Sequence, residues 1–225
     1  MVMGAEAFDF GAHTIALTRD AMPTCAVCGE KAARCACDNN TVWRDGATPE
    51  RADTLIDPSE PFIAYCDGSG TVFDKPCGWG VVVIRRGVVI AEASAADERG
   101  TNNYAEVCGI GASLRLLEAV ASSLAGRRTV TFRAIVRSDS QWALEASSPT
   151  SAWSLKSKEK DGSPKRSTVV ALALRKLRAR YPRVEYEWVE GHAGEVYNER
   201  ADELAGRARR AFLAKHNTVK KESST

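Results

Sequence analysis

Long apolar runs, a secretory leader and a disulfide framework are all missing from this sequence. No apolar stretch approaches the ~20 residues that a membrane-spanning helix requires. The N-terminal segment MVMGAEAFDFGAH has neither a basic region nor an apolar stretch, so it does not resemble a secretory signal. The seven cysteines are unevenly placed, which argues against a small secreted domain held by disulfides. We therefore expect an intracellular protein, most simply a cytoplasmic one, with no membrane association.

The net charge is only +2, but the charges are gathered in blocks of opposite sign. The net charge is −5 over residues 1–60, +8 over 156–183, −6 over 184–206 and +5 from 207 onward. A single block of this kind is commonly a solvated surface. A basic block next to an acidic one inside a folded domain suggests instead a polyanion held beside a metal-binding site.

The chain contains no internal repeat and divides by composition into one sizeable domain with smaller flanking segments. We expect a cysteine-rich module over 1–43, a polar linker rich in Pro and Asp over 44–60, the main domain over 61–214, and a basic polar tail over 215–225. The tail is expected to be disordered.

Hydrophobic patterning within the main domain predicts three successive strands followed by alternating helices and strands. Val107, Ile110 and Leu114 recur at helical spacing, whereas the stretches before them are continuous β-prone runs. Strands are predicted at 61–67, 79–86, 87–95, 129–139 and 183–191, and helices at 103–124, 167–181 and about 195–215. The fold class is therefore α/β, with a mixed five-stranded sheet flanked by helices.

Four carboxylates lie near the ends of four of these elements. Asp67 and Asp139 each end a predicted strand, and parallel pairing of the two strands would bring them together where α/β sheets hold ligands. Glu106 lies in the first turn of the long helix and Asp202 in the early turns of the last one. Each acid alone can also be a turn residue or a favourable charge near a helix N-terminus.

Four segments of the sequence resemble the successive signature motifs of ribonuclease H of type 1. They are YCDGSG, TNNYAEVCGIGASL, VRSDSQWAL and EWVEGHAGEVYNERADELA, and the resemblance spans roughly residues 61–212. It implies an RNase H-like fold and endonucleolytic hydrolysis of the RNA strand of RNA–DNA hybrids, which leaves 3′-hydroxyl and 5′-phosphate ends. It also makes residues 61–214 the catalytic domain.

Two other functions stay open beside this one. Another nuclease of the same superfamily, an integrase or a junction resolvase, is disfavoured by the pair Asn102–Asn103 beside Glu106 and by the GHAG loop. A catalytically silent binding module is disfavoured by the intact set of four carboxylates, because each is an electrostatic burden without a metal.

The resemblance assigns a role to each acidic residue around two Mg²⁺ ions, with Mn²⁺ as an alternative. Crowded carboxylates need compensating cations, and open sites of hard oxygen ligands favour these metals over zinc. By similarity, Asp67 bridges both ions, while Glu106 and Asp139 complete the ion near the leaving 3′ oxygen. Asp202 holds the ion that activates the water. His192 matches the family's mobile histidine, which assists turnover, although a lone loop histidine can also be a plain surface residue.

The resemblance also implies contacts to the hybrid. Discrimination of RNA from DNA depends on the 2′-hydroxyl. The positions that match the family's minor-groove contacts are Gly68, Ser69, Asn102, Asn103 and Gln141. Thr101 is either a phosphate contact or the N-cap of the long helix. The basic segment that corresponds most weakly to the family's protrusion supplies Lys156, Lys158, Lys160, Lys165 and Arg166, with Trp153 as its aromatic residue.

The N-terminal cysteines follow the pattern C-x2-C-x6-C-x-C. The four are Cys25, Cys28, Cys35 and Cys37. Four thiolates at this spacing can hold one Zn²⁺, although free or redox-active cysteines and an iron–sulfur centre are alternatives. The acidic charge of this module is the wrong sign for gripping phosphates, so we expect a structural clip or a contact to another protein. The expected partners are thus an RNA–DNA hybrid and a protein bound by the module, with the chain itself a monomer.

Overall fold

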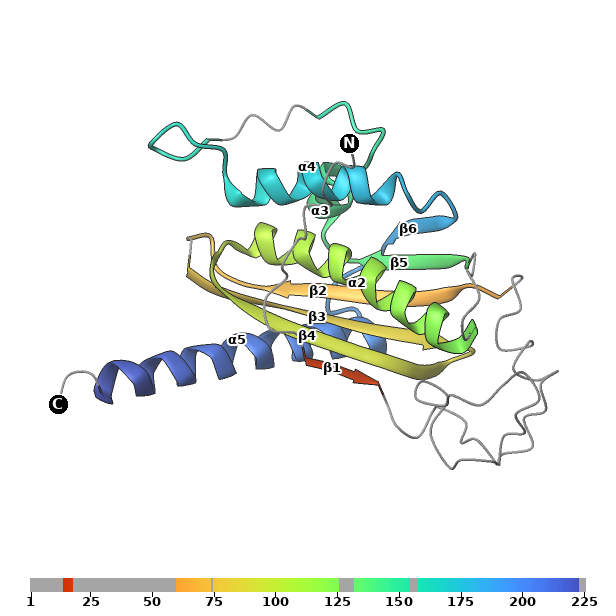
Figure 1. Cartoon of the computed structure of the whole chain (residues 1–225), viewed down its shortest axis with the longest axis horizontal. Helices are drawn as coiled ribbons and strands as arrows, with labels where there is room; N and C mark the ends of the chain where they lie inside the picture. The colour runs from red at the N-terminus through yellow and green to blue at the C-terminus, as the bar shows by residue number, and fades with distance from the viewer. Residues whose placement is uncertain (1–13, 18–59, 74, 126–131, 154–157, 223–225) are drawn as a thin grey trace, which may run out of the picture.

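A six-stranded mixed sheet with helices on both faces forms the body of the protein (Figure 1). The computed structural model describes residues 14–17, 60–73, 75–125, 132–153 and 158–222. The strands are β1 Thr14–Leu17, β2 Phe62–Ser69, β3 Lys75–Arg85, β4 Val88–Gly100, β5 Ala134–Ser138 and β6 Val184–Trp188, in the sheet order β1-β4-β3-β2-β5-β6. The helices are α2 Asn102–Ala125, α3 Gln141–Ala146, α4 Arg166–Arg178 and α5 Val196–Glu222. None of the helices within these ranges is long and apolar enough to cross a membrane.

The main core lies between the sheet and the helices α2, α3 and α4. The long helix α2 buries Val107, Ile110 and Leu114 against the strands, which confirms the helical spacing predicted from the sequence. The opposite face of the sheet is covered by α5, whose Ala201 and Leu204 pack on a smaller cluster. The two layers of helices hold the sheet between them, as the α/β class predicts.

Strands β2, β5 and β6 run parallel and therefore end at the same edge of the sheet. Phe62 pairs with Ala134 in the β2–β5 ladder, and Ala134 pairs in turn with Val184 of β6. The pairs β2–β3 and β3–β4 are antiparallel, so the sheet is mixed, as predicted. We call the edge at which β2, β5 and β6 end the C-terminal edge of the sheet.

Helix α5 lies directly against β3 because β3 has a glycine at the point of closest approach. A Cβ on Gly80 would collide with the carbonyl oxygen of Ala201 and would lie 2.7 Å from the Leu204 Cβ. Gly80 pairs with Asp67 of β2. The contact thus fixes the early turns of α5 beside the middle of the sheet, close to Asp67.

The tail predicted to be disordered is instead a continuation of α5. The helix runs through Glu222, so the prediction for residues 215–222 was wrong. After Gly206 the segment contains no glycine or proline to stop a helix. The Phe212 ring also stacks on His216 one turn later, with ring centroids 4.2 Å apart.

A sixth strand joins the five that were predicted. Strand β1 comes from the segment assigned to the cysteine-rich module and pairs antiparallel with β4, from Thr14 opposite Ser94 to Leu17 opposite Ala91. The outer edge of β4 offers unpaired backbone groups to such a segment. The cysteines 25, 28, 35 and 37 and most of the linker lie outside the described residues.

Candidate active site

Asp67 and Glu106 meet because the first turns of α2 lie against the end of β2. A Cβ on Gly68 would lie 2.5 Å from the Glu106 backbone nitrogen and 2.8 Å from the carbonyl carbon of Ala105. Only a glycine at this position permits so close an approach. The DGSG sequence therefore places a carboxylate on β2 and leaves room for a second one from α2.

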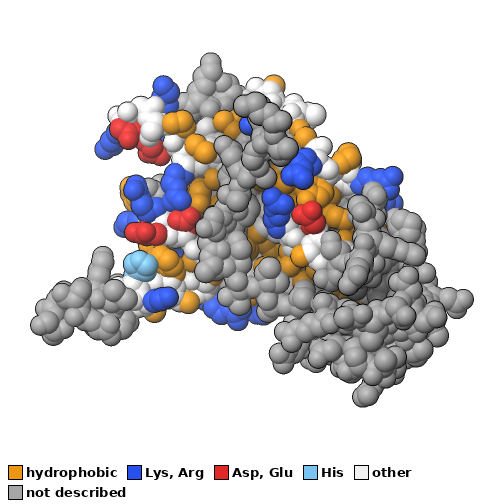
Figure 2. All heavy atoms as spheres, viewed as in Figure 1, with side chains coloured by type: hydrophobic (Ala, Val, Ile, Leu, Met, Phe, Trp, Pro, Cys, Tyr) orange, Lys and Arg blue, Asp and Glu red, His pale blue; other side chains and the backbone are white. Residues whose placement is uncertain are grey.

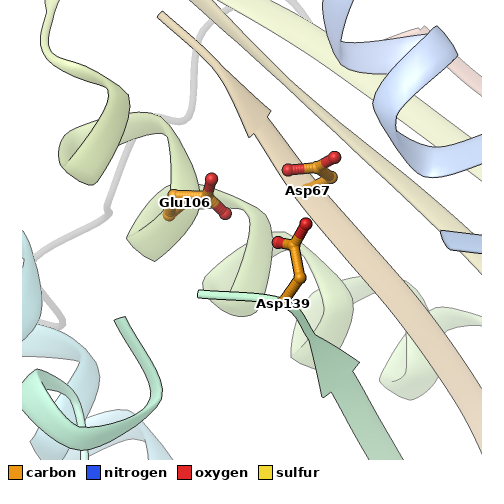
Figure 3. Close-up of side chains that lie close together, drawn as sticks. All are labelled: Asp67, Glu106 and Asp139. Atoms are coloured by element: carbon orange, nitrogen blue, oxygen red, sulfur yellow. The ribbon is translucent and has the colours of Figure 1, made fainter. Parts of the chain in front are cut away.

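Asp139 joins this pair from the neighbouring parallel strand. The last pair of the β2–β5 ladder is Tyr65 with Arg137, and Asp67 and Asp139 each lie two positions further along. One carboxylate oxygen from each of Asp67, Glu106 and Asp139 can be chosen so that all three lie within 4.8 Å of one another. Figure 3 shows the three side chains converging from β2, α2 and the end of β5.

Burial and mutual repulsion make this cluster costly to ionise. Asp67 and Glu106 are each only 5% exposed. Burial raises the pKa of Asp67, and the Asp139 charge raises it further. Burial likewise raises the pKa of Glu106, with the Asp67 charge as the next cause. The Gly68 N–H donates to Asp67 Oδ1 over 2.6 Å and the Asn102 amide donates to Glu106 Oε1 over 3.2 Å, but neither bond offsets the burial.

The cluster fits a hard divalent cation. Glu106 Oε2 is buried and accepts no hydrogen bond within the described part of the chain. A buried carboxylate oxygen without a donor is costly unless a cation compensates it. Three carboxylates at this spacing are the ligands that Mg²⁺ and Mn²⁺ prefer.

Asp202 lies near the cluster but outside its tightest group. It is half-buried on α5, directly after Ala201, which contacts Gly80. Its charge contributes to the raised pKa of Asp67, which places it within electrostatic reach of that carboxylate. Three of the four predicted carboxylates are thus gathered at one point, and the fourth lies on α5, in the other layer of the fold.

The segment after β6 closes the same edge. The Trp188 indole N–H donates to the Asp139 carbonyl oxygen over 2.9 Å, so the end of β6 holds the backbone of Asp139. His192 follows in an exposed loop and has a φ of 53°. The predicted histidine is therefore accessible at the C-terminal edge.

A groove of about 520 Å³ lies beside α2 and contains several of the predicted substrate contacts. Its lining residues are Thr71, Val72, Thr101, Asn102, Asn103, Trp142, Trp153, Lys165, Ser167 and Thr168. Thr101 also caps α2, because its Oγ1 accepts a hydrogen bond from the Tyr104 N–H over 3.3 Å, so the N-cap alternative is confirmed. Gln141 lines an adjoining hollow that shares Trp142 and Trp153 with the groove.

The basic residues predicted to bind phosphates differ in their surroundings. Lys158 and Lys160 are exposed in the loop before α4, and Lys156 lies outside the described residues. Arg166 is held by the protein itself: its Nη2 donates to Asp97 Oδ2 over 3.0 Å, and its guanidinium lies 4.6 Å from the Tyr104 ring centroid. Arg166 therefore links α4 to α2 and β4.

Sequence reasoning missed the loop between β2 and β3. Val72 is 83% exposed and lines the groove, and its neighbour Phe73 is 67% exposed. The preceding Thr71 is tied to α2, because its carbonyl oxygen accepts a hydrogen bond from the Asn102 N–H over 2.8 Å. Two large apolar residues one position after the Gly-Ser-Gly sequence are the signal that could have indicated this exposed tip.

Carboxylates gathered at the C-terminal edge of a mixed sheet, beside an accessible groove, are typical of hydrolases that use divalent metal ions. The RNase H family model matches residues 59–210 of this chain. The chain is similar to ribonuclease H of Caulobacter sp. (strain K31), with 32% identity over 144 residues that cover 64% of this chain and 86% of that protein. It is equally similar to ribonuclease H of Aromatoleum aromaticum, with 32% identity over 145 residues and the same coverage, 64% and 86%.

A solved structure agrees with these sequence relatives. The N-terminal RNase H domain of a Mycobacterium tuberculosis protein superposes with a TM-score of 0.51 and 27% identity, over 70% of this chain and 99% of that one. The chain belongs to the RNase H family. It is therefore a ribonuclease, a hydrolase of phosphodiester bonds.

Proposed function

We propose that this protein is an endoribonuclease that hydrolyses the RNA strand of RNA–DNA hybrids and leaves 3′-hydroxyl and 5′-phosphate ends. The observation that carries the proposal is the convergence of Asp67, Glu106 and Asp139 at the C-terminal edge, in a chain that belongs to the RNase H family. Integrase or junction-resolvase activity has no comparable support, since the relatives that the chain matches are ribonucleases H.

Asp67, Glu106, Asp139 and Asp202 would hold two Mg²⁺ ions, for which Mn²⁺ can substitute. When bound, the ions would activate the attacking water and stabilise the charge on the leaving 3′ oxygen. The protein itself keeps the first three carboxylates close together and shielded from water. This arrangement disfavours their ionised forms, as the raised pKa values of Asp67 and Glu106 indicate. Asp202 approaches from α5 and supplies the fourth charge.

His192 assists turnover rather than metal binding. It is exposed in a loop with a glycine on one side, Gly191, and a second glycine two positions later, Gly194. This loop follows the strand whose Trp188 holds Asp139, so it lies at the same edge as the carboxylates. An exposed imidazole at this edge can contact the product as it leaves the site.

The groove beside α2 receives the minor groove of the hybrid. The side chains of Asn102, Asn103 and Gln141 supply donors and acceptors for ribose 2′-hydroxyls and base edges. Gly68 and Ser69, at the end of β2, are the backbone positions that match the family's contacts. Phosphates are held by Lys156, Lys158, Lys160 and Lys165, which carry charge but no sequence information. Arg166 supports this surface through Asp97 and contributes its charge to it.

A cleavage assay on four matched substrates tests the proposal. Labelled RNA–DNA hybrid, double-stranded RNA, double-stranded DNA and single-stranded RNA of one sequence are incubated with the full chain, with MgCl₂ or with a chelator. Cleavage of the RNA strand of the hybrid alone, only with magnesium, is the expected result. Cleavage of branched or double-stranded DNA would favour the integrase or resolvase alternative, and binding without cleavage would favour a silent module.

The N-terminal cysteines form a separate proposal. We infer one Zn²⁺ held by Cys25, Cys28, Cys35 and Cys37, in an acidic module that contacts a protein partner. Metal analysis of freshly reduced protein, purified without a chelator, should find about one zinc per chain. A variant with all four cysteines replaced by serine is the control, and zinc retained by that variant would contradict the assignment.

Two broader proposals rest on the sequence alone. We infer an intracellular location, most simply cytoplasmic, from the composition and cysteine usage. We also infer that the chain acts as a monomer. Fractionation of cells and light scattering of the purified protein test these two points separately.

A further inference from the structure

The second half of α5 leaves the body of the protein at the C-terminal edge of the sheet. The Arg209 guanidinium donates from Nε to the carbonyl oxygen of Pro76 over 3.0 Å, and Pro76 is the second residue of β3. Residues 210–222 continue the helix beyond this contact. At a rise of about 1.5 Å per residue they reach roughly 20 Å further. Figure 1 shows this part of α5 projecting past the strands on the side where the β2–β3 loop lies.

The projecting part of α5 is mostly basic, and its one acidic residue is Glu222 at the end of the helix. Between Gly206 and Lys221 the sequence has six basic residues and no acidic one. Arg207, Arg210 and Lys215 are exposed. The nearest acid on the helix, Glu203, is already paired with Arg200, whose Nη1 lies 2.6 Å from Glu203 Oε2. Lys and Arg side chains recur along the same side of the molecule, from the loop before α4 down to α5, with acidic side chains between them (Figure 2).

The helix α5 projects at the same edge of the sheet as the carboxylates, so a ligand of this helix would lie next to the active site. It leaves the sheet at the edge that bears Asp67, Glu106 and Asp139, next to the loop whose Val72 lines the groove. A polyanion seated in the groove and extended past this edge would reach the side of the molecule on which α5 projects. At about 3.4 Å per step, the helix can follow roughly six nucleotide steps of a strand.

We propose that the basic surface formed by Arg207, just before the Arg209 contact, and by Arg210 and Lys215 on the projecting part of α5 binds phosphates of the hybrid that flank the cleaved segment. This proposal rests on the proposed function, because the hybrid is the polyanion that the edge receives. The surface adds affinity through counterion release and takes no part in the chemistry. It makes the enzyme prefer hybrids long enough to reach the helix.

Neutralising the surface tests the proposal with a matched control. The test variant is Arg207→Gln, Arg210→Gln, Lys215→Gln in the full chain. The control variant is Lys176→Gln, Arg180→Gln, Arg183→Gln, which removes the same residue types from exposed positions near the start of β6, at the opposite edge of the sheet. Binding of hybrids of about 8 and about 24 base pairs is measured in a chelator at several salt concentrations, and cleavage is measured in MgCl₂.

The test variant should bind the long hybrid on the order of tenfold more weakly than wild type, with a salt dependence reduced by about one to three units of slope. The short hybrid, the control variant and the turnover number at saturating hybrid should be unchanged. A third variant, Arg207→Lys, Arg210→Lys, should bind like wild type, which separates charge from helix stability. Equal salt slopes for test and control variants on the long hybrid would overturn the proposal. Absence of cleavage by wild type would instead refute the proposed function.

Discussion

At the scale of the single residue, Asp139 is the position where charge can be removed from the site with the least disturbance. Asp139→Asn keeps the side-chain volume and the backbone bond from Trp188. It removes a repulsion that raises the pKa of both Asp67 and Glu106. We expect cleavage to fall by at least roughly 10²–10³-fold while the melting temperature of the metal-free protein stays equal or rises. Steady-state cleavage and thermal melts check this, and near wild-type activity would refute the metal site.

The raised pKa values of Asp67 and Glu106 predict how stability depends on pH. The carboxyl groups of the folded site stay protonated up to a higher pH than those of the unfolded chain, whose pKa values are about 4. Between that value and the raised folded values, the folded state binds more protons, so stability falls as pH rises. The metal-free protein should therefore lose stability from this site as pH increases from mildly acidic to alkaline.

Glu106→Gln tests this effect at the buried pair itself. The variant removes the buried acid but keeps an oxygen for the Asn102 amide. It should gain more than about 1 kcal/mol over wild type at pH 8 and much less at pH 5, in chelator. Denaturant melts at the two pH values measure this difference. A constant difference between the two proteins would contradict the assigned cause.

The neighbours Lys165 and Arg166 should separate binding from stability. Lys165 lines the groove, whereas Arg166 is paired with Asp97 and stacked on Tyr104. Lys165→Gln should weaken hybrid binding and lower its salt slope by about 0.7–0.9 while leaving stability unchanged. Arg166→Gln should cost about 1 kcal/mol of stability or less. Salt titrations of hybrid binding and denaturant melts on both variants measure the two effects. Equal changes in binding and in stability for the two variants would contradict the prediction.

At the scale of the element, the approach of α2 to β2 determines whether the site exists. Gly68→Ala places a methyl group 2.5 Å from the Glu106 backbone nitrogen, so α2 must move away from β2. We expect a loss of about 1–3 kcal/mol in stability and a larger loss of cleavage, because Glu106 is displaced from Asp67. Cleavage assays and melts are compared with Gly206→Ala, where the added methyl meets only the mobile end of Arg210. Wild-type cleavage by Gly68→Ala would show that the close approach is not needed.

Local patterning predicted most elements, and the two failures have different causes. The spacing of Val107, Ile110 and Leu114 is a property of α2 itself and was sufficient to place the helix. Strand β1 depends on the free edge of β4, roughly eighty positions away, and no short window contains that information. The helical tail was missed because its polar, basic composition resembles that of a disordered segment.

For the active site too, the sequence identified residues but not the contacts that depend on distant parts of the chain. The motifs identified the carboxylates, and the parallel register of β2 and β5 then brings Asp67 and Asp139 together. The sequence could not show that Lys165 faces the groove while Arg166 turns to Asp97, because that partner lies 69 positions earlier in the chain. Nor could it show the exposure of Phe73, which depends on where Thr71 is tied to α2.

At the scale of the whole molecule, the catalytic body should function without the N-terminal region. All of the clustered carboxylates and the groove come from residues 60–222. Deleting residues 1–59 should leave the ratio kcat/KM for hybrid within a few fold of wild type. It also removes β1 and exposes the edge of β4 around Ala91–Ser94, so self-association should increase.

Cleavage assays and light scattering over a range of concentrations check this pair of outcomes on the full chain and the truncated one. Loss of cleavage with an unchanged melting temperature would show that the N-terminal region completes the active site. A truncated protein that stays as monomeric as the full chain would show that β1 does not protect the edge.

The order of the elements, with α5 after every strand of the sheet, has a consequence for folding. Until this helix docks, the face of the sheet that bears Tyr65 and Val82 has no cover, and Asp202 has not reached the site. Domains generally fold as units, so the strands and α2 cannot complete the tertiary structure before residues 196–209 have joined them. A nuclease built in this order is inert until α5 docks, and assembly of the fold and onset of cleavage coincide.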